Sequence, residues 1–339
     1  MPTFANDSGT NKPLKNLYVK QAGVWLPVQR SSIKRNGAWV STYDAEVKVT
    51  LSSETTNLDV QSLYSVEDWA NTYKKKILVI PSGVVVGATS TSLAALNTGS
   101  GRGGLLEIVV DGEVLGAGGA TTGAAGGAAI NIEQSGVTVY VNGAVRGGGG
   151  AGGKGGTGGG GYYGTTVSQP ASGWYGDNGV GGYYIYRDTS VSGAYKWYWA
   201  RSLITTTGDV GAVTVGSYTY YRGSVFQNQG GGVSYSQIRR TYVATTNTSG
   251  GAGGSGGRGQ GYDGALAAGA AGAAGGTNAG KGGTGGTGGI WGAVGATGAT
   301  GANGNRTNGT AGAAGGAAGA AITGVARTVV NTGTINGSY

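Results

Sequence analysis

Apolar and polar residues alternate along two early stretches of the chain, Glu46–Leu51 and Lys76–Val86. Alternation of period two is typical of a strand with one buried face, so both stretches are predicted to be β-strands. Between them, Ser65–Asp68 has the spacing of a capping box just before Trp69, which predicts one short helix. The run Lys74–Lys76 is interpreted as a solvated surface or helix end rather than an anion site.

Three later segments share one pattern: Leu106–Gly116, Val137–Gly147 and Arg327–Gly337. Each contains a strand, a turn with Asn or Asp that tolerates positive φ, a second short strand and a Gly. The first two repeat as stacked coils of a β-solenoid would. The C-terminal strand is therefore expected to return beside the first two, which makes residues 147–321 an excursion from this base.

Near the N-terminus two Gly-x-Trp units, Gly23–Trp25 and Gly37–Trp39, follow short strand-like stretches. The pair predicts two hairpins. One interpretation makes both Trp residues core residues packed on each other. The other makes the hairpins a docking module that attaches the chain to a larger assembly through Trp25 and Trp39.

Glycine is abundant, with 77 residues in 339, and it is segregated. Five Pro are too few for collagen, and interior Gly disfavours long helices. Residues 147–161 hold 12 Gly in 15, and Gly280–Gly304 has Gly at every third position. A period of three without Pro is interpreted as a packed bundle of polyproline II helices, and a flexible Gly-rich linker is the alternative.

The chain has no His and no Cys, which removes the commonest general base, thiolate chemistry and the usual zinc ligands. No cofactor, metal or enzymatic activity is expected. The formal net charge of +8 favours anionic partners. The N-terminus has no signal-peptide pattern, and no apolar run is long enough for membrane insertion.

Residues 162–248 hold 17 of the 29 aromatic residues of the chain. They also hold six basic residues and three acidic ones, Asp177, Asp188 and Asp209. Tyr and Trp among Gly, Ser and Asn is the composition of antibody loops, because rigid amphipathic rings give contact area at little entropic cost. The candidate receptor contacts are Trp174, Tyr175, Tyr184, Tyr186, Arg187, Trp197, Tyr198, Trp199, Arg239 and Arg240.

Two other functions have some support in the sequence. A polysaccharide depolymerase would need paired carboxylates, and the three Asp residues of the aromatic segment are the candidates. A glycine-rich structural or nucleic-acid-binding protein is suggested by Arg102–Gly104 and Arg146–Gly148, but isolated Arg-Gly-Gly copies are better explained as turns, so no nucleic-acid partner is expected.

Five segments, Ile80–Ser90, Asn97–Gly99, Val110–Gly119, Gly315–Ile322 and Asn331–Gly337, resemble the glycine-rich distal domain of bacteriophage tail-fibre and tail-tip adhesins. The resemblance implies a polyproline II sandwich whose loops touch a host receptor, at the distal tip of the tail or fibre of the virion. It implies two kinds of partner: a bacterial surface receptor, which is lipopolysaccharide, a capsule glycan or an outer-membrane protein, and other tail proteins. It leaves a homotrimer open.

The expected fold is mainly β with irregular structure and very little helix. Residues 1–45 are assigned to an attachment module, 46–98 to a β linker region, and 99–339 to a glycine-rich adhesin domain. Within that domain, residues 162–248 are expected to form receptor-reading loops and residues 249–321 the polyproline II tract. The expected function is host attachment.

Overall fold

A computed structural model of the chain contains two compact units. Unit 1 combines Met1–Gly160 with Ser249–Tyr339, and unit 2 spans Gly161–Thr248. In the described residues, regular structure is mainly β, with one 3-10 helix, η1 (Val60–Leu63), and one α-helix, α1 (Val66–Ala70), which confirms the expectation of a mainly β fold with very little helix. The structure describes residues 4–7, 10–13, 18–28, 30–35, 37–170, 184–187, 195–199, 202–207, 212–215, 217–228 and 234–339.

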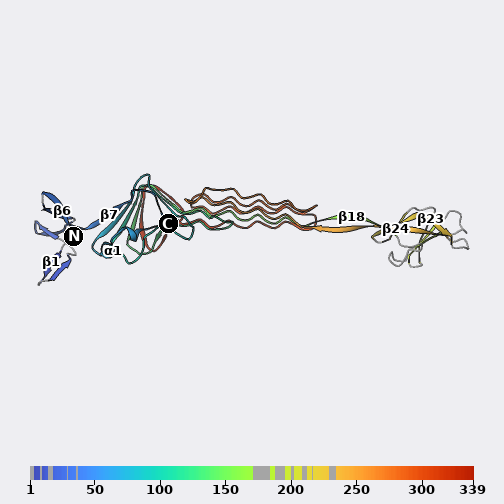
Figure 1. Ribbon diagram of the computed structural model, residues 1–339, viewed down its shortest axis with the longest axis horizontal. Helices are drawn as coiled ribbons and strands as arrows, with labels where there is room; N and C mark the ends of the chain where they lie inside the picture. Colours follow the sequence, from blue (N-terminus) through green and yellow to red (C-terminus); the bar gives the residue numbers. More distant parts are fainter. Residues whose placement is uncertain are drawn as a thin grey trace. The chain divides into compact units, whose positions relative to one another are not determined.

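Three parallel sheets of unit 1 are built from successive coils of the chain (Figure 1). The first sheet contains β7 (Glu46–Thr50), β10 (Lys75–Ile80), β13 (Leu106–Val110), β16 (Val137–Val141) and β26 (Arg327–Asn331). The second contains β8 (Thr55–Thr56), β11 (Val85–Gly87), β14 (Glu113–Leu115), β17 (Ala144–Arg146) and β27 (Thr334–Asn336). The third contains β9 (Leu58–Asp59), β12 (Leu96–Asn97), β15 (Ile130–Ile132) and β25 (Ile322–Gly324). Strands from residues 46–98 therefore lie in the same sheets as the later strands.

The alternating apolar residues of the predicted strands form the core of these sheets. Leu78, Ile108 and Val139 occupy the same register position in the first sheet, and all three are fully buried. Buried residues of all three sheets form one hydrophobic cluster. Strand β26 pairs in register with β16, which pairs with β13. The expected return of the C-terminal strand beside the two earlier repeats is confirmed.

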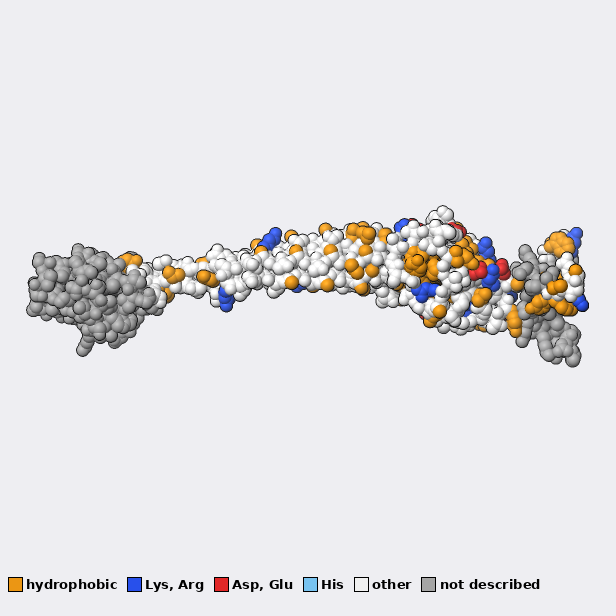
Figure 2. Space-filling view, turned by 180° about the vertical axis from the view of Figure 1, so that it is seen from behind, with side chains coloured by type: hydrophobic (Ala, Val, Ile, Leu, Met, Phe, Trp, Pro, Cys, Tyr) orange, Lys and Arg blue, Asp and Glu red, His pale blue; other side chains and the backbone are white. Residues whose placement is uncertain are grey.

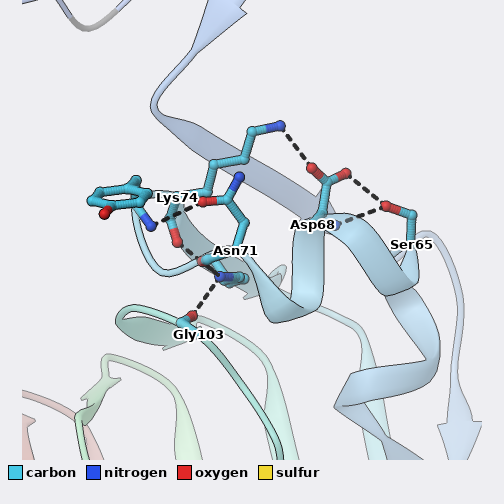
Figure 3. Close-up of polar contacts among 7 residues, drawn as sticks. Ser65, Asp68, Asn71, Lys74 and Gly103 are labelled. Atoms are coloured by element: carbon cyan, nitrogen blue, oxygen red, sulfur yellow. Dashed lines mark hydrogen bonds and ion pairs between the residues drawn. The ribbon is translucent and has the colours of Figure 1, made fainter. Parts of the chain in front are cut away.

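Helix α1 begins where the capping box predicts. The Ser65 hydroxyl accepts a hydrogen bond from the backbone N–H of Asp68 at 3.1 Å, and the Asp68 carboxylate lies 2.6 Å from Lys74 Nζ (Figure 3). Burial acts to raise the pKa of Asp68. The hydrogen bonds from Lys74 and Ser65 outweigh burial, so the pKa of Asp68 lies below its ordinary value.

Lys76 is fully buried beneath this helix, so the interpretation of Lys74–Lys76 as a solvated surface is wrong at this position. Its ammonium group donates to three backbone carbonyl oxygens, at 2.5 Å from Asn71, 2.9 Å from Lys74 and 2.5 Å from Gly103. Burial, followed by the positive charge of Arg102, lowers the pKa of Lys76 to about 8. Because Asn71 and Lys74 lie just before β10 and Gly103 just before β13, this Lys links two successive coils.

The glycine-rich segments of unit 1 run side by side as a bundle of extended chains (Figure 1). Their hydrogen bonds repeat every three residues: the N–H groups of Gly152, Gly155 and Gly158 donate to the carbonyls of Gly257, Gly254 and Gly251. On another side, the N–H groups of Gly153, Gly156 and Gly159 donate to the carbonyls of Ala296, Ala299 and Ala302. Residues 148–160 are thus the central chain of the bundle.

Glycine is required in this bundle because backbone contacts backbone. A Cβ built on Gly152 would overlap the carbonyl oxygen of Gly286, and one built on Gly153 would overlap that of Ala313. The central chain has such contacts on two of its three sides, which explains why 10 of its 13 residues are Gly. The chain from 280 to 289 also has such contacts on two sides and has Gly at two of every three positions, whereas the chain from 295 to 304 needs Gly only at every third position.

One turn fastens the bundle to the sheets. The ring of Tyr262 occupies the space that a Cβ on Gly87 would need, and its hydroxyl donates to Glu54 at 2.6 Å. The neighbouring Asp263 accepts a hydrogen bond from the N–H of Gly118 at 2.8 Å. Figure 2 shows hydrophobic side chains gathered over the sheets and scattered along the bundle.

The N-terminal region contains three separate hairpins: β1 (Phe4–Asp7) with β2 (Thr10–Pro13), β3 (Tyr18–Gln21) with β4 (Val24–Pro27), and β5 (Arg30–Arg35) with β6 (Ala38–Asp44). The predicted Gly-x-Trp hairpins are therefore present. Trp25 and Trp39 are 63% and 73% exposed, so the interpretation of both as core residues is wrong. A two-stranded hairpin has no second layer in which to bury a Trp.

Replacing one central glycine tests the backbone packing. In Gly153→Ala the new Cβ meets a carbonyl oxygen that is itself hydrogen-bonded, so we expect a loss of more than about 3 kcal/mol in unfolding free energy. Thermal unfolding followed by circular dichroism measures it. The control Ala314→Ser changes an exposed residue of a neighbouring chain and should stay within about 0.5 kcal/mol of wild type. Equal melting temperatures for the two variants would contradict the packing.

Lys76→Met tests the buried ammonium group. It leaves three carbonyl oxygens without their donor, so we expect a loss of about 3 kcal/mol at pH 7, measured by urea unfolding. The unfolded Lys titrates near pH 10.4, above the folded value of about 8, so the unfolded chain binds more protons in this window. Wild-type stability should therefore rise from pH 8 to pH 10 relative to Lys76→Met. Parallel pH curves would contradict the lowered pKa of Lys76.

Candidate functional site

Unit 2 contains one sheet of seven strands, and this sheet includes the aromatic segment. Its order is β21-β20-β19-β24-β23-β22, and β18 also pairs with β24. Strand β19 pairs with β20 on one side and with β24 on the other, and β24 in turn pairs with β23. The strands are β18 (Gly161–Pro170), β19 (Tyr184–Arg187), β20 (Tyr195–Trp199), β21 (Ser202–Thr207), β22 (Ala212–Val215), β23 (Tyr218–Asn228) and β24 (Ser234–Thr248).

Eight of the ten predicted contact residues lie in three neighbouring strands of this sheet. Trp174 and Tyr175 lie outside the described residues. The others are Tyr184, Tyr186 and Arg187 in β19, Trp197, Tyr198 and Trp199 in β20, and Arg239 and Arg240 in β24. The fold therefore brings together residues that are up to 56 positions apart in the sequence (184 to 240).

These eight residues do not share one face of the sheet. Residues paired directly across antiparallel strands lie on the same face, and neighbours along a strand lie on opposite faces. Tyr184 pairs with Tyr198, and Tyr186 pairs with both Lys196 and Tyr235. These five residues therefore lie on one face. By the same alternation Arg239 lies on that face, whereas Arg187, Trp197, Trp199 and Arg240 lie on the other.

The charged residues within the described strands of unit 2 are all basic. Arg187, Lys196, Arg222, Arg239 and Arg240 lie in these strands. The three acidic residues of the segment, Asp177, Asp188 and Asp209, lie outside the described residues. Among the residues that the structure describes, no group of His, Cys, Asp or Glu could hold a metal ion. No helix in that part of the chain is long and apolar enough to cross a membrane.

Sequence reasoning missed a second cluster of polar residues, at the end of the bundle where the chain leaves for unit 2. Exposed Asn278 and Asn305 lie in adjacent turns, with the N–H of Asn305 donating to the carbonyl of Asn278 at 3.1 Å. The N–H groups of Arg306 and Thr307 both donate to the carbonyl of Gly160. The signal in the sequence was the break in the glycine period after residue 304, where Asn, Arg and Thr replace Gly and Ala.

The N-terminal hairpins present the predicted attachment residues. Trp25 lies in β4 and Trp39 in β6, and both side chains are exposed. The ammonium group of Lys20 lies 5.8 Å from the centroid of the Trp25 ring, which is within the range of a cation–π contact. Exposed Trp on an isolated hairpin is typical of a surface that another protein covers.

A scaffold bonded backbone to backbone that carries a sheet rich in aromatic and basic residues is typical of a binding protein. Residues 46–228 match the model of the family described as phage tail fibre adhesin Gp38. The match covers more than half of the chain, so the chain belongs to this family, and the resemblance drawn from the sequence is confirmed. No curated protein and no solved structure matches the chain.

The family is one of adhesins of the phage tail fibre. It therefore gives this chain a role in host attachment and a location in the virion tail. The matched residues include strands of all three parallel sheets, the central chain of the bundle and most of unit 2. The family thus covers both the scaffold and the candidate site.

Thr307 anchors the turn cluster to the exit of the central chain, because its hydroxyl accepts a hydrogen bond from the N–H of Gly160 at 2.7 Å. Thr307→Val keeps the shape of the side chain and removes this acceptor. We expect a loss of about 1 kcal/mol in unfolding free energy, measured by thermal unfolding. Thr307→Ser keeps the hydroxyl and should retain most of the stability. Equal melting temperatures of the Val and Ser variants would show that this hydrogen bond does not contribute to stability.

Proposed function

We propose that this chain is the receptor-binding adhesin at the distal tip of a phage tail fibre, and that unit 2 recognises the bacterial surface. The observation that carries this proposal is the gathering of eight predicted contact residues into neighbouring strands of one sheet. Aromatic rings stack on sugar rings or apolar loops, and Arg and Lys bind anionic groups. The receptor is lipopolysaccharide, a capsule glycan or an outer-membrane protein.

We propose that the N-terminal region, residues 1–45, attaches the adhesin to another tail protein through Trp25 and Trp39. Their exposure on two-stranded hairpins supports this role, since such hairpins are marginally stable alone. The sequence predicts that residues 46–98 are a β linker region. Their strands pair with β13 and β14, and we propose that they act with residues 99–146 as one rigid support.

We also propose that the parallel coils form a β-solenoid and that the bundle chains are polyproline II helices. Three sheets of in-register parallel strands support the first assignment. The second is supported by the hydrogen-bond period of three and by glycine at each close approach. Extended chains of this kind would hold unit 2 on a scaffold that needs no apolar core of its own.

Neither Arg-Gly-Gly segment supports the alternative of a nucleic-acid-binding protein. Arg102 is buried, and its guanidinium group donates to the carbonyl oxygens of Gly104 and Ser135. Arg146 lies 3.6 Å from the Glu113 carboxylate of the adjacent coil. Both Arg side chains therefore have structural partners within the sheets. A depolymerase remains the alternative enzyme, and it would release oligosaccharide from host polysaccharide.

Deleting unit 2 tests the proposal. Gly161 and Thr248 are paired across the ribbon, so a two-residue turn can join them in place of residues 162–247. We expect the shortened chain to keep its melting temperature and to lose adsorption to host cells, measured by fluorescence of bound labelled protein. Thr307→Ser in the full chain is the control, and it should adsorb as wild type does.

Undiminished adsorption of the folded deletion variant would overturn the assignment of receptor binding to unit 2. Release of reducing ends from host polysaccharide by the wild-type chain would favour the depolymerase.

A further inference from the structure

Strands β18 and β24 form a ribbon at the base of unit 2. Gly161 pairs with Thr248, and the antiparallel register continues pair by pair to Thr166 opposite Val243. Among the described strands, β23 joins β24 only at Tyr242 and at lower-numbered residues. The six pairs before that point, which we call the bare ribbon (161–166 with 243–248), are therefore only two strands wide.

Both faces of the bare ribbon reach solvent. One face contains Tyr162 and Val243, which are 44% and 62% exposed. The other face contains exposed Thr165 and Thr246 beside half-buried Tyr163. The hydrophobic core cluster of the described residues includes none of the bare ribbon. A two-stranded ribbon of this kind is marginally stable in water, because it buries little apolar surface.

The segments on either side of the bare ribbon are more extensively bonded. On the bundle side, the N–H of Gly160 donates to the Thr307 hydroxyl at 2.7 Å, and the carbonyl of Gly159 accepts from the N–H of Gly280. On the other side, β24 acquires β23 as a third strand at Tyr242. Local unfolding costs least where few apolar contacts hold the chain and its backbone hydrogen bonds are exposed. The bare ribbon is therefore expected to be the least stable part of this path.

The sequence of the bare ribbon adds to this weakness. Gly164 lies opposite Thr245 in the middle of the ribbon, where it offers no side chain for packing across the strands. None of the residues in the bare ribbon is charged, so no ion pair within it can fix one orientation.

We propose that the bare ribbon is a hinge, at which the rest of unit 2 changes its orientation relative to the bundle. This inference rests on the proposed function and adds how the adhesin meets a surface. Bending there disturbs hydrogen bonds between two strands, whereas bending within the bundle would break those between several chains at once. Hinge motions of this kind take microseconds to milliseconds. A receptor-binding unit on such a hinge can meet its receptor while the fibre approaches the cell surface at different angles.

Paired spin labels on either side of the hinge measure this motion in the full chain. The chain has no Cys, so two introduced Cys residues are the sole labelling sites. Ala311→Cys lies at an exposed position of the bundle, and Ser217→Cys lies at an exposed position next to the start of β23. The control pair, Ala311→Cys with Ala317→Cys, lies within one chain of the bundle. We expect the distance distribution from double electron–electron resonance to be at least twice as wide for the first pair as for the control.

A shortened hinge tests where the motion occurs. Deleting residues 162–163 and 246–247 removes two pairs and preserves the alternation of faces, because side chains alternate with period two. We expect the distribution between the labels at 311 and 217 to narrow toward that of the control, with an unchanged melting temperature. Hydrogen exchange of the wild-type chain is a second measurement that needs no variant. Hydrogen-bonded amides of the bare ribbon should exchange at least tenfold faster than those of Gly152, Gly155 and Gly158 in the bundle.

A distribution as narrow as the control in the unshortened chain would overturn the hinge, and so would equal exchange in the bare ribbon and the bundle. An undiminished width in the shortened chain would place the motion outside the bare ribbon and overturn its assignment. Loss of host adsorption on deletion of unit 2 is measured separately, and it would leave the proposed function standing in each of these cases.

Discussion

Close approach of backbone to backbone, with no side chain between, is the constraint on which unit 1 depends. The central chain of the bundle exchanges hydrogen bonds with chains on several sides, through groups such as Gly152, Gly153 and Gly283. Each such bond contributes on the order of 1 kcal/mol, so stability comes from their number. A single methyl group at most of these positions would separate two chains and break several bonds at once. Glycine content is therefore a geometric requirement here, set by how many neighbours each chain has.

The parallel sheets give this bundle its register. The chain leaves the second sheet after β14 and β17, and the N–H groups of Gly116 and Gly119 donate to the carbonyls of Arg146 and Gly149. Successive coils thus stay bonded as they leave the apolar core and enter the bundle. The core supplies the buried apolar side chains that the glycine-rich bundle lacks. The turn at Tyr262 and Asp263 connects the bundle to the sheets through its hydrogen bonds to Glu54 and Gly118. A hydrophobic core and a backbone-bonded bundle form one continuous structure.

The sequence predicted the features that depend on local periodicity and failed where two distant segments meet. The capping box at Ser65, the strand repeats and the period of three in glycine were readable because each lies within a few residues. Lys76 looked like a surface residue, because its carbonyl acceptors include Gly103, 27 positions away. The two faces of the aromatic sheet were invisible for another reason. Tyr occurs on both faces, so apolar and polar residues do not alternate, and only the register separates them.

Unit 1 and unit 2 are joined in a way that separates the requirements of the scaffold from those proposed for receptor binding. The chain enters unit 2 at Gly161 and leaves it at Thr248, and these two residues pair with each other. The bundle can therefore close whether or not large side chains lie between these two positions. Most contacts in the bundle are between backbone atoms, so substitutions in unit 2 leave them unchanged. Under the proposed function, an adhesin built in this way can change its aromatic and basic residues without loss of its support. The proposed function therefore concentrates recognition where glycine is sparse.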